Sequence, residues 1–175
     1  MAPDKTDPPK KKPPRPKKSG PPVPSFTEFL QEAERLCETA LAMLREQGHH
    51  GPTVIAWCRD GHREVIGLSL KDCPLSMGDV LKALVRFRRV HSFVAISEAW
   101  MTRGEAASLS VMPSKSPERE QVLCVSAIHP EAKRMWVYPF ASEGGRVVVG
   151  ALLSSEGMTL GGGIPEALGG EEGQP

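Results

Sequence analysis

The first half of the chain has hydrophobic residues at helical spacing. Ser25 and Glu28 form a capping box, in which the hydroxyl and the carboxylate satisfy backbone donors at a helix start. Apolar residues then recur every three or four positions up to Gly48, a residue type that commonly ends helices. The pattern predicts one helix whose core-facing stripe comprises Phe26, Phe29, Leu30, Ala33, Cys37, Ala40, Leu41 and Leu44.

A second helix is predicted after residue 75. Ser76 and Asp79 form another capping box, and Leu75 with Val80 forms a hydrophobic staple beside it. The spacing of the following apolar residues indicates a helix that packs on one side only. Its expected core stripe is Met77, Val80, Leu81, Leu84 and Val85.

The rest of the middle section has the pattern of a β-sheet. Two β-rich runs, residues 53–58 and 63–70, flank Asp60-Gly61, which is a strong hairpin signal. A two-residue loop would pair Trp57 with Glu64. Further strands are expected at residues 92–101, 121–128, 135–140 and 146–153. The order α-β-β-α-β-β-β-β predicts an α+β fold, with two helices packed on one face of a mainly antiparallel sheet of about six strands.

Composition divides the chain into three parts. Residues 1–24 contain nine prolines and few apolar side chains, and residues 154–175 contain seven glycines and four Glu. Neither segment has enough apolar surface to form a core, so we expect a disordered basic, proline-rich arm and a disordered acidic, glycine-rich tail around an α+β domain at residues 25–153. No apolar run is long enough for a transmembrane segment. The four scattered cysteines and the proline-rich start favour a cytoplasmic protein.

The basic arm is a candidate for weak polyanion binding. Residues 1–25 hold seven Lys and Arg against two Asp. Such a segment attracts nucleic acid or an anionic membrane by releasing counterions. The alternative is a solubilising tail without a partner. The candidate residues are Lys10, Lys11, Lys12, Arg15, Lys17 and Lys18.

Glu98, Trp100 and Arg119 form the candidate site of the middle section. Glu98 and Trp100 interrupt an otherwise apolar strand and point to the same side as Ile96, so the carboxylate is expected at the margin of the core. A partly buried carboxylate needs a partner, and Arg119 at the end of the 102–120 loop is a suitable bidentate one. The group is either a ligand pocket closed by the loop or an ion pair that holds the loop in place.

The same stretch carries a resemblance. The string Ser97-Glu98-Ala99-Trp100-Met101, then Pro113-Ser114, then Pro117-x-Arg119, resembles small bacterial α+β proteins of unknown function that have a similar Glu-Ala-Trp to Pro-x-Arg block. The resemblance covers only residues 90–130. It implies that Glu98, Trp100 and Arg119 belong to one local arrangement, and it implies no activity.

No metal or cofactor site is expected. Cys58 and His62 are close in sequence, but in a hairpin with a two-residue loop Cys58 would pair with Arg63, and His62 would project from the opposite face. His91, His129 and the His49-His50 pair occupy ordinary positions. The chain has no G-x-S-x-G nucleophile motif, and the Gly-rich residues 157–163 lack the lysine and helix of a phosphate-binding loop.

The sequence therefore favours a non-enzymatic binding or interaction module, which acts through its sheet or its long loop and is attached weakly by the basic arm. The alternative is a small hydrolase-like enzyme with a pocket around Glu98 and the 102–120 loop. A deep pocket around Glu98 with a second titratable group would favour the enzyme, whereas a flat surface with Glu98 tied to Arg119 would favour the module. The sequence specifies no particular partner.

Overall fold

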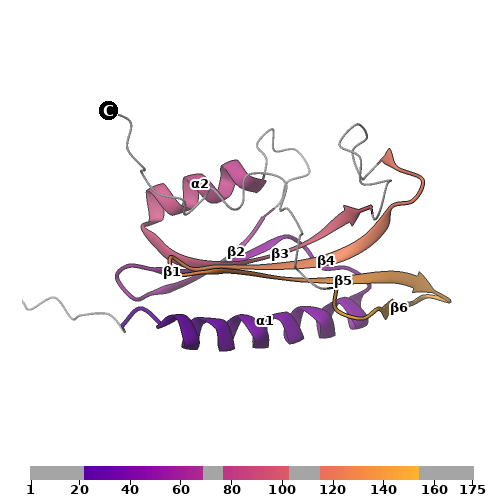
Figure 1. Cartoon of the computed structure of the whole chain (residues 1–175), viewed down its shortest axis with the longest axis horizontal. Coiled ribbons are helices and arrows are strands. Elements are labelled where there is room, and N and C mark those ends of the chain that lie inside the picture. The colour runs from indigo at the N-terminus through magenta and orange to yellow at the C-terminus, as the bar shows by residue number, and fades with distance from the viewer. Residues whose placement is uncertain (1–21, 69–76, 103–114, 154–175) are drawn as a thin grey trace, which may run out of the picture.

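The computed structural model describes residues 22–68, 77–102 and 115–153, which form a six-stranded antiparallel sheet between two helices (Figure 1). The predicted α+β class and element order are confirmed. The basic arm up to residue 21, the acidic tail, Ser76 and most of the 102–120 loop lie outside the described residues. The elements are α1 (Phe26–Gln47), β1 (Thr53–Cys58), β2 (Arg63–Gly67), α2 (Met77–Arg88), β3 (Val90–Met101), β4 (Glu120–Ile128), β5 (Lys133–Glu143) and β6 (Arg146–Val149).

Helix α1 begins and ends where the sequence predicts. The Ser25 hydroxyl accepts a hydrogen bond from the Glu28 backbone N–H at 3.4 Å, and the Glu28 carboxylate accepts one from the Ser25 N–H at 2.9 Å. Gly48 ends the helix in the left-handed conformation, with φ of 80°. Six of the eight residues in the predicted stripe are buried, and Phe26 and Leu30 pack partly buried beside them.

The strand order is β2-β1-β3-β4-β5-β6, and every neighbouring pair is antiparallel. β5 and β6 are joined by Gly144-Gly145, both with positive φ, as a two-residue hairpin turn requires. The ladder between β4 and β5 ends at the Val122 and Pro139 pair, whereas β4 continues to pair with β3 as far as Glu120. The start of β4 therefore separates from β5, and in Figure 1 this end of β3 and β4 rises away from α1.

The two helices cover opposite faces of the sheet, so their predicted placement on one face is wrong. Ile55 and Trp57 of β1 pack in the cluster under α1, whereas their neighbours Val54 and Ala56 pack in the cluster under Leu81 of α2. Adjacent residues of a strand point to opposite faces. All residues of β1 after Thr53 are buried, and a strand buried on both sides needs a cover on each.

The hairpin between β1 and β2 differs from the expected register by one residue. The loop has three residues, because the Cys58 N–H donates to the His62 carbonyl at 2.9 Å and Trp57 pairs with Arg63 rather than with Glu64. Only Gly61 of the loop has a positive φ, at 84°. A type I turn followed by a left-handed glycine needs only this one residue, so Asp60-Gly61 suits the longer loop as well as the shorter one.

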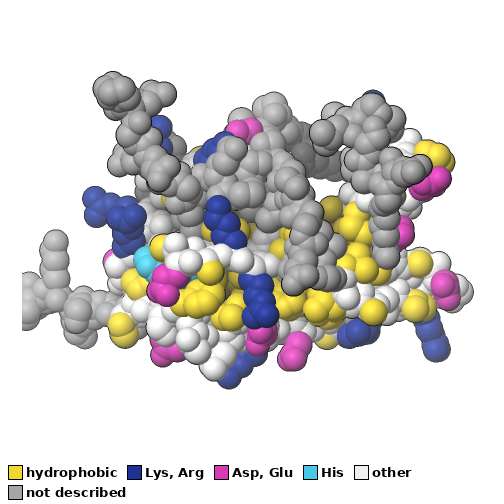
Figure 2. Space-filling view, viewed as in Figure 1, with side chains coloured by type: hydrophobic (Ala, Val, Ile, Leu, Met, Phe, Trp, Pro, Cys, Tyr) yellow, Lys and Arg dark blue, Asp and Glu magenta, His cyan; other side chains and the backbone are white. Residues whose placement is uncertain are grey.

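Charged side chains lie mostly at the periphery. Figure 2 shows hydrophobic side chains along the level of the sheet and Lys and Arg side chains around it. Within the described ranges, neither helix has both the length and the apolar composition needed to cross a bilayer.

Candidate functional site

Glu98 connects three parts of the chain on the face covered by α1. The His50 backbone N–H, just after α1, donates to one carboxylate oxygen at 2.5 Å, and the Gln121 side-chain amide donates to the other at 3.0 Å. His50 is buried, and Glu98 and Gln121 are half-buried. Glu98 thus has the position at the core margin that its spacing predicts, with both oxygens engaged.

Arg119 contacts Trp100. Its guanidinium carbon lies 4.6 Å from the centroid of the Trp100 ring, a cation–π distance. The expected partner of Glu98 was Arg119, but the hydrogen bonds described for Glu98 go to His50 and Gln121 instead. The structure thus places Glu98 in one set of contacts and Trp100 of β3 in another, with Arg119, the residue before β4.

Trp100 is exposed to solvent, unlike the other two tryptophans. Its relative exposure is 43%, against 8% for both Trp57 and Trp136. Along β3, burial is nearly complete as far as Ile96 and then decreases towards Trp100. The pair of Trp100 and Arg119 therefore presents an aromatic ring and a cation beside the well-packed part of the sheet.

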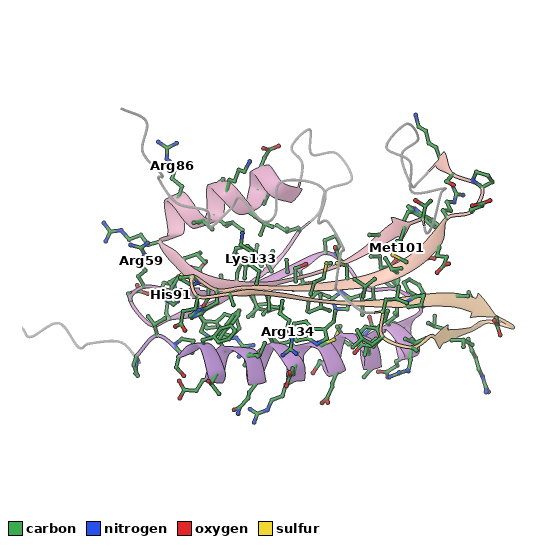
Figure 3. The ribbon with its side chains drawn as sticks, in the orientation of Figure 1. Arg59, Arg86, His91, Met101, Lys133 and Arg134 are labelled. Carbon is green, nitrogen blue, oxygen red and sulfur yellow. The ribbon has the colours of Figure 1, made fainter. Side chains whose placement is uncertain are left out.

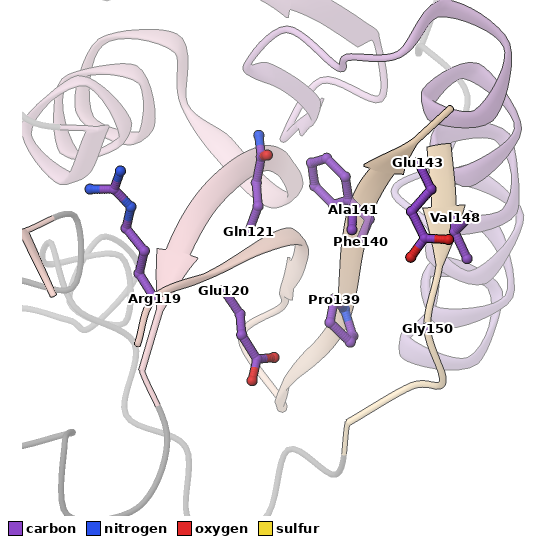
Figure 4. A pocket seen from close by; sticks show the side chains of 9 residues that line it. All are labelled: Arg119, Glu120, Gln121, Pro139, Phe140, Ala141, Glu143, Val148 and Gly150. Atoms are coloured by element: carbon purple, nitrogen blue, oxygen red, sulfur yellow. The ribbon is translucent and has the colours of Figure 1, made fainter. Parts of the chain in front are cut away.

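A pocket of about 410 Å³ adjoins this pair, where the start of β4 separates from β5 (Figure 4). Arg119 and Gln121 line one side, and residues of β5, β6 and Gly150 line the other. The pocket is open to solvent. Its described lining contains no histidine, cysteine or serine, and its titratable groups are Arg119, Glu120 and Glu143.

Gly150 shapes the wall of this pocket. Its N–H donates to the Pro139 carbonyl at 2.7 Å, which continues the pairing of the chain with β5 beyond β6. A Cβ atom at Gly150 would lie 2.9 Å from Pro139 Cγ, closer than real contacts allow. A side chain at position 150 would therefore push Gly150 and Pro139 apart within the same wall of the pocket.

The tip of the β1–β2 hairpin brings together residues that the predicted register separates. With Cys58 paired to His62, both side chains project to the face covered by α2, and Glu64 projects to the same face. One ligand atom from each of the three residues lies within 4.8 Å of the other two. The reason given for expecting no metal at Cys58 and His62 therefore does not hold.

His62 also contacts both neighbouring carboxylates. Its Nδ1 lies 2.5 Å from an Asp60 oxygen and its Nε2 lies 3.0 Å from a Glu64 oxygen. Hydrogen bonds to Glu64 and then to Asp60 raise the pKa of His62 above its usual value. The sequence did not identify Asp60 and Glu64 as part of a site, because the expected register puts His62 and Glu64 on the face opposite Cys58.

His91 at the start of β3 and His129 just after β4 form a separate arrangement. The rings of His91 and His129 are 5.0 Å apart, and the buried His129 also packs on Phe29 of α1 at 5.3 Å. Burial, and secondarily His129 and Arg59, lower the pKa of His91. Figure 3 shows Arg59 and His91 at the same end of the sheet, far from Met101.

Comparisons of the chain with protein-family models, with curated proteins and with solved structures found no match. The resemblance in the Glu98 to Arg119 block stays a prediction. The basic residues from Lys10 to Lys18 lie outside the described residues, so their role also stays a prediction.

Proposed function

We propose that the protein is a non-enzymatic interaction module that binds a partner with the Trp100–Arg119 pair and the adjoining pocket. The observation that carries this proposal is a 43% exposed tryptophan with an arginine guanidinium 4.6 Å from its ring, because the same arginine also lines an open pocket. Tryptophan and arginine are the residues most enriched at the energetic centres of protein interfaces.

The contacts of Glu98 favour binding over hydrolysis. A general base needs a free lone pair directed at substrate, and a hydrolase needs a nucleophile or an activated water. Each Glu98 oxygen already accepts a hydrogen bond, Glu98 does not line the pocket, and the described lining has no serine, threonine, cysteine, lysine or histidine. In this proposal Glu98 is structural: its hydrogen bonds link β3 and β4 to the segment after α1 and so stabilise the Trp100 surface.

The pocket indicates the chemistry of the partner. Its lining combines Pro139, Phe140 and Val148 with charges of both signs, Arg119 on one side and Glu143 on the other. This mixture suits a protein segment with an apolar anchor and flanking charged residues. A nucleic acid would instead require a predominantly basic lining.

The basic arm supplies a second, weaker attachment in this proposal. Deleting residues 1–24 removes seven of the 22 Lys and Arg and two of the 21 Asp and Glu, which changes the formal net charge from +1 to −4. We expect the truncated protein to fold and to lose most affinity for nucleic acid or anionic vesicles. A salt titration of both forms tests this, since arm-mediated binding weakens steeply with salt. Undiminished binding after truncation would contradict it.

The Trp100 surface is tested by partner capture followed by affinity measurement. Proteins retained by the wild type should be lost with Trp100→Ala and Arg119→Ala and kept with Val65→Ala, a matched change at an exposed apolar residue on β2. For a partner so identified, Trp100→Ala should weaken Kd about 30-fold or more, the effect of an interface hot spot. Partner binding should also shield Trp100 from acrylamide quenching. An unchanged Kd for both variants would refute the proposal.

A further inference from the structure

The hairpin tip holds three different metal-binding side chains on one face. The Cys58 thiol comes from the end of β1, the His62 ring from the loop end, and the Glu64 carboxylate from β2. Their ligand atoms lie within 4.8 Å of one another. We propose that Cys58, His62 and Glu64 bind a zinc ion.

The donor set and the distances fit zinc. Zinc takes thiolate, imidazole and carboxylate ligands at about 2.0 to 2.3 Å, so its ligand atoms are about 3.4 Å apart in a tetrahedron. The Nε2 of His62 is 3.0 Å from the Glu64 oxygen, so a modest opening of the group admits the ion. The exposed fractions of the His62 and Glu64 side chains, 49% and 24%, leave them room for this adjustment.

Asp60 orients the histidine for this role. The Asp60 carboxylate is 2.5 Å from Nδ1 of His62, which fixes the ring proton on that nitrogen and directs Nε2 towards Glu64. A carboxylate behind a metal-bound histidine is the usual arrangement around zinc, and it raises the basicity of the ligand. Zinc would replace the proton that Nε2 shares with Glu64, and binding would release protons.

The surroundings differ on the two sides of the site. Cys58 is 1% exposed and belongs to the apolar cluster under α2, so its sulfur is shielded from water. The side chains of His62 and Glu64 are partly exposed to solvent. Three protein ligands leave a fourth position for water or an exchangeable ligand. The hairpin tip lies at the opposite end of the sheet from Met101 and the Trp100 surface (Figure 3), so the zinc site is independent of the proposed interaction surface.

Zinc titration of the untagged full-length protein, stripped with chelator and kept reduced, tests the proposal. Competition with a chromophoric chelator should show one equivalent bound. His62→Gln and Glu64→Gln should each weaken binding by about 100-fold or more, and Asp60→Asn by about 10 to 100-fold. His49→Gln, at an exposed histidine outside the cluster, is the matched control and should leave Kd unchanged.

Cobalt substitution tests the thiolate separately. Wild type should show thiolate-to-cobalt charge-transfer absorption, which should disappear in Cys58→Ser and persist in Cys124→Ser. Circular dichroism verifies that each variant is folded, and His62→Gln and Glu64→Gln decide the question if Cys58→Ser is not. The proposal is overturned if the wild type binds no stoichiometric zinc, or if both His62→Gln and Glu64→Gln bind it unchanged.

Discussion

The two faces of the sheet have hydrophobic clusters of different size. Under the 22-residue α1, fifteen buried residues form one cluster that extends across β1, β3, β4 and β5. Under the 12-residue α2, the described buried cluster has eight residues, and Leu81 is its one member from the helix. Among the described residues, the α1 face therefore has the larger share of the buried apolar side chains. At the hairpin tip, the buried Cys58 of the α2 cluster lies beside His62 and Glu64, whose side chains are partly exposed to solvent.

The largest expected effect is on the α1 face. Phe29 is 1% exposed and meets Trp57 edge to face, with ring centroids 5.2 Å apart. Phe29→Ala should lower the free energy of unfolding by about 3 to 5 kcal/mol, because it removes these contacts and leaves a cavity. Urea unfolding measures the change. Met43→Ala, at an exposed position of the same helix, is the control and should change stability by less than about 0.5 kcal/mol.

The same truncation on the α2 face should have a smaller effect. Leu81 is 1% exposed but belongs to the smaller cluster. Leu81→Ala should destabilise by about 2 to 3 kcal/mol, the lower part of the range for buried leucine, since a thin cover can close over the cavity. The same urea titration compares the two variants. A loss equal to that of Phe29→Ala would mean that the two faces contribute equally.

Substitutions of Glu98 test how much its hydrogen bonds, in addition to the apolar core, stabilise the α1 face of the sheet. Glu98→Ala leaves the His50 N–H and the Gln121 amide without their acceptor, at a cost of about 1 to 3 kcal/mol. Glu98→Gln keeps an oxygen for the His50 N–H and should lose less. Thermal melts of both variants measure the difference. If Glu98→Gln were as unstable as Glu98→Ala, the charge rather than the hydrogen bond would be the important property.

The smallest expected effect is a shift in the pKa of His91. It tests the contact between the two faces of the sheet. Trp57 pairs with Ser92 and Cys58 with Val90, so His91 is the extra residue of a bulge, and its ring contacts His129 beside α1. NMR titration should give a pKa below the ordinary 6.5, first because of burial and then because of His129 and Arg59, with Glu131 opposing.

The lowered pKa of His91 has a defined consequence for stability. The unfolded chain binds the proton more tightly, so the stability contributed by neutral His91 is fully present above the unfolded pKa of 6.5 and is lost as pH falls from there through the lower folded pKa. Arg59→Ala should raise the His91 pKa without unfolding the protein, and Glu131→Gln should lower it. An unshifted pKa in wild type would show that the ring is solvated away from His129.

The sequence predicted the positions of the helices and strands better than the way they pack and pair with one another. Helical spacing and the capping box located α1, because these signals are local. The placement of α2 was wrong although a signal existed, since the unbroken apolar run from Val54 to Cys58 is typical of a strand buried on both faces. The loop length at Asp60-Gly61 has no such signal, because both possible loops accept these residues.

The candidate site shows the same limit. The spacing of Glu98 predicted a carboxylate at the core margin, and the structure places it there. Its partner at His50 is a backbone N–H, which any residue provides, so no side-chain pattern identifies it. Arg119 was the obvious cation to assign to Glu98, but Arg119 lies just before β4 and its guanidinium packs over the Trp100 ring. Predicting such pairings requires the register of β3 against β4.

The strand order also bears on how the chain folds. Of the neighbouring strands described, all pairs are consecutive in sequence except β1 and β3, which are separated by β2 and α2. Hairpins between consecutive strands close short loops, whereas joining β1 to β3 closes a loop of some 30 residues and loses more chain entropy. We therefore expect this pairing to limit the folding rate. Substitutions that weaken it, such as Val94→Ala, should slow refolding more than equally destabilising ones in β6, which should mainly speed unfolding.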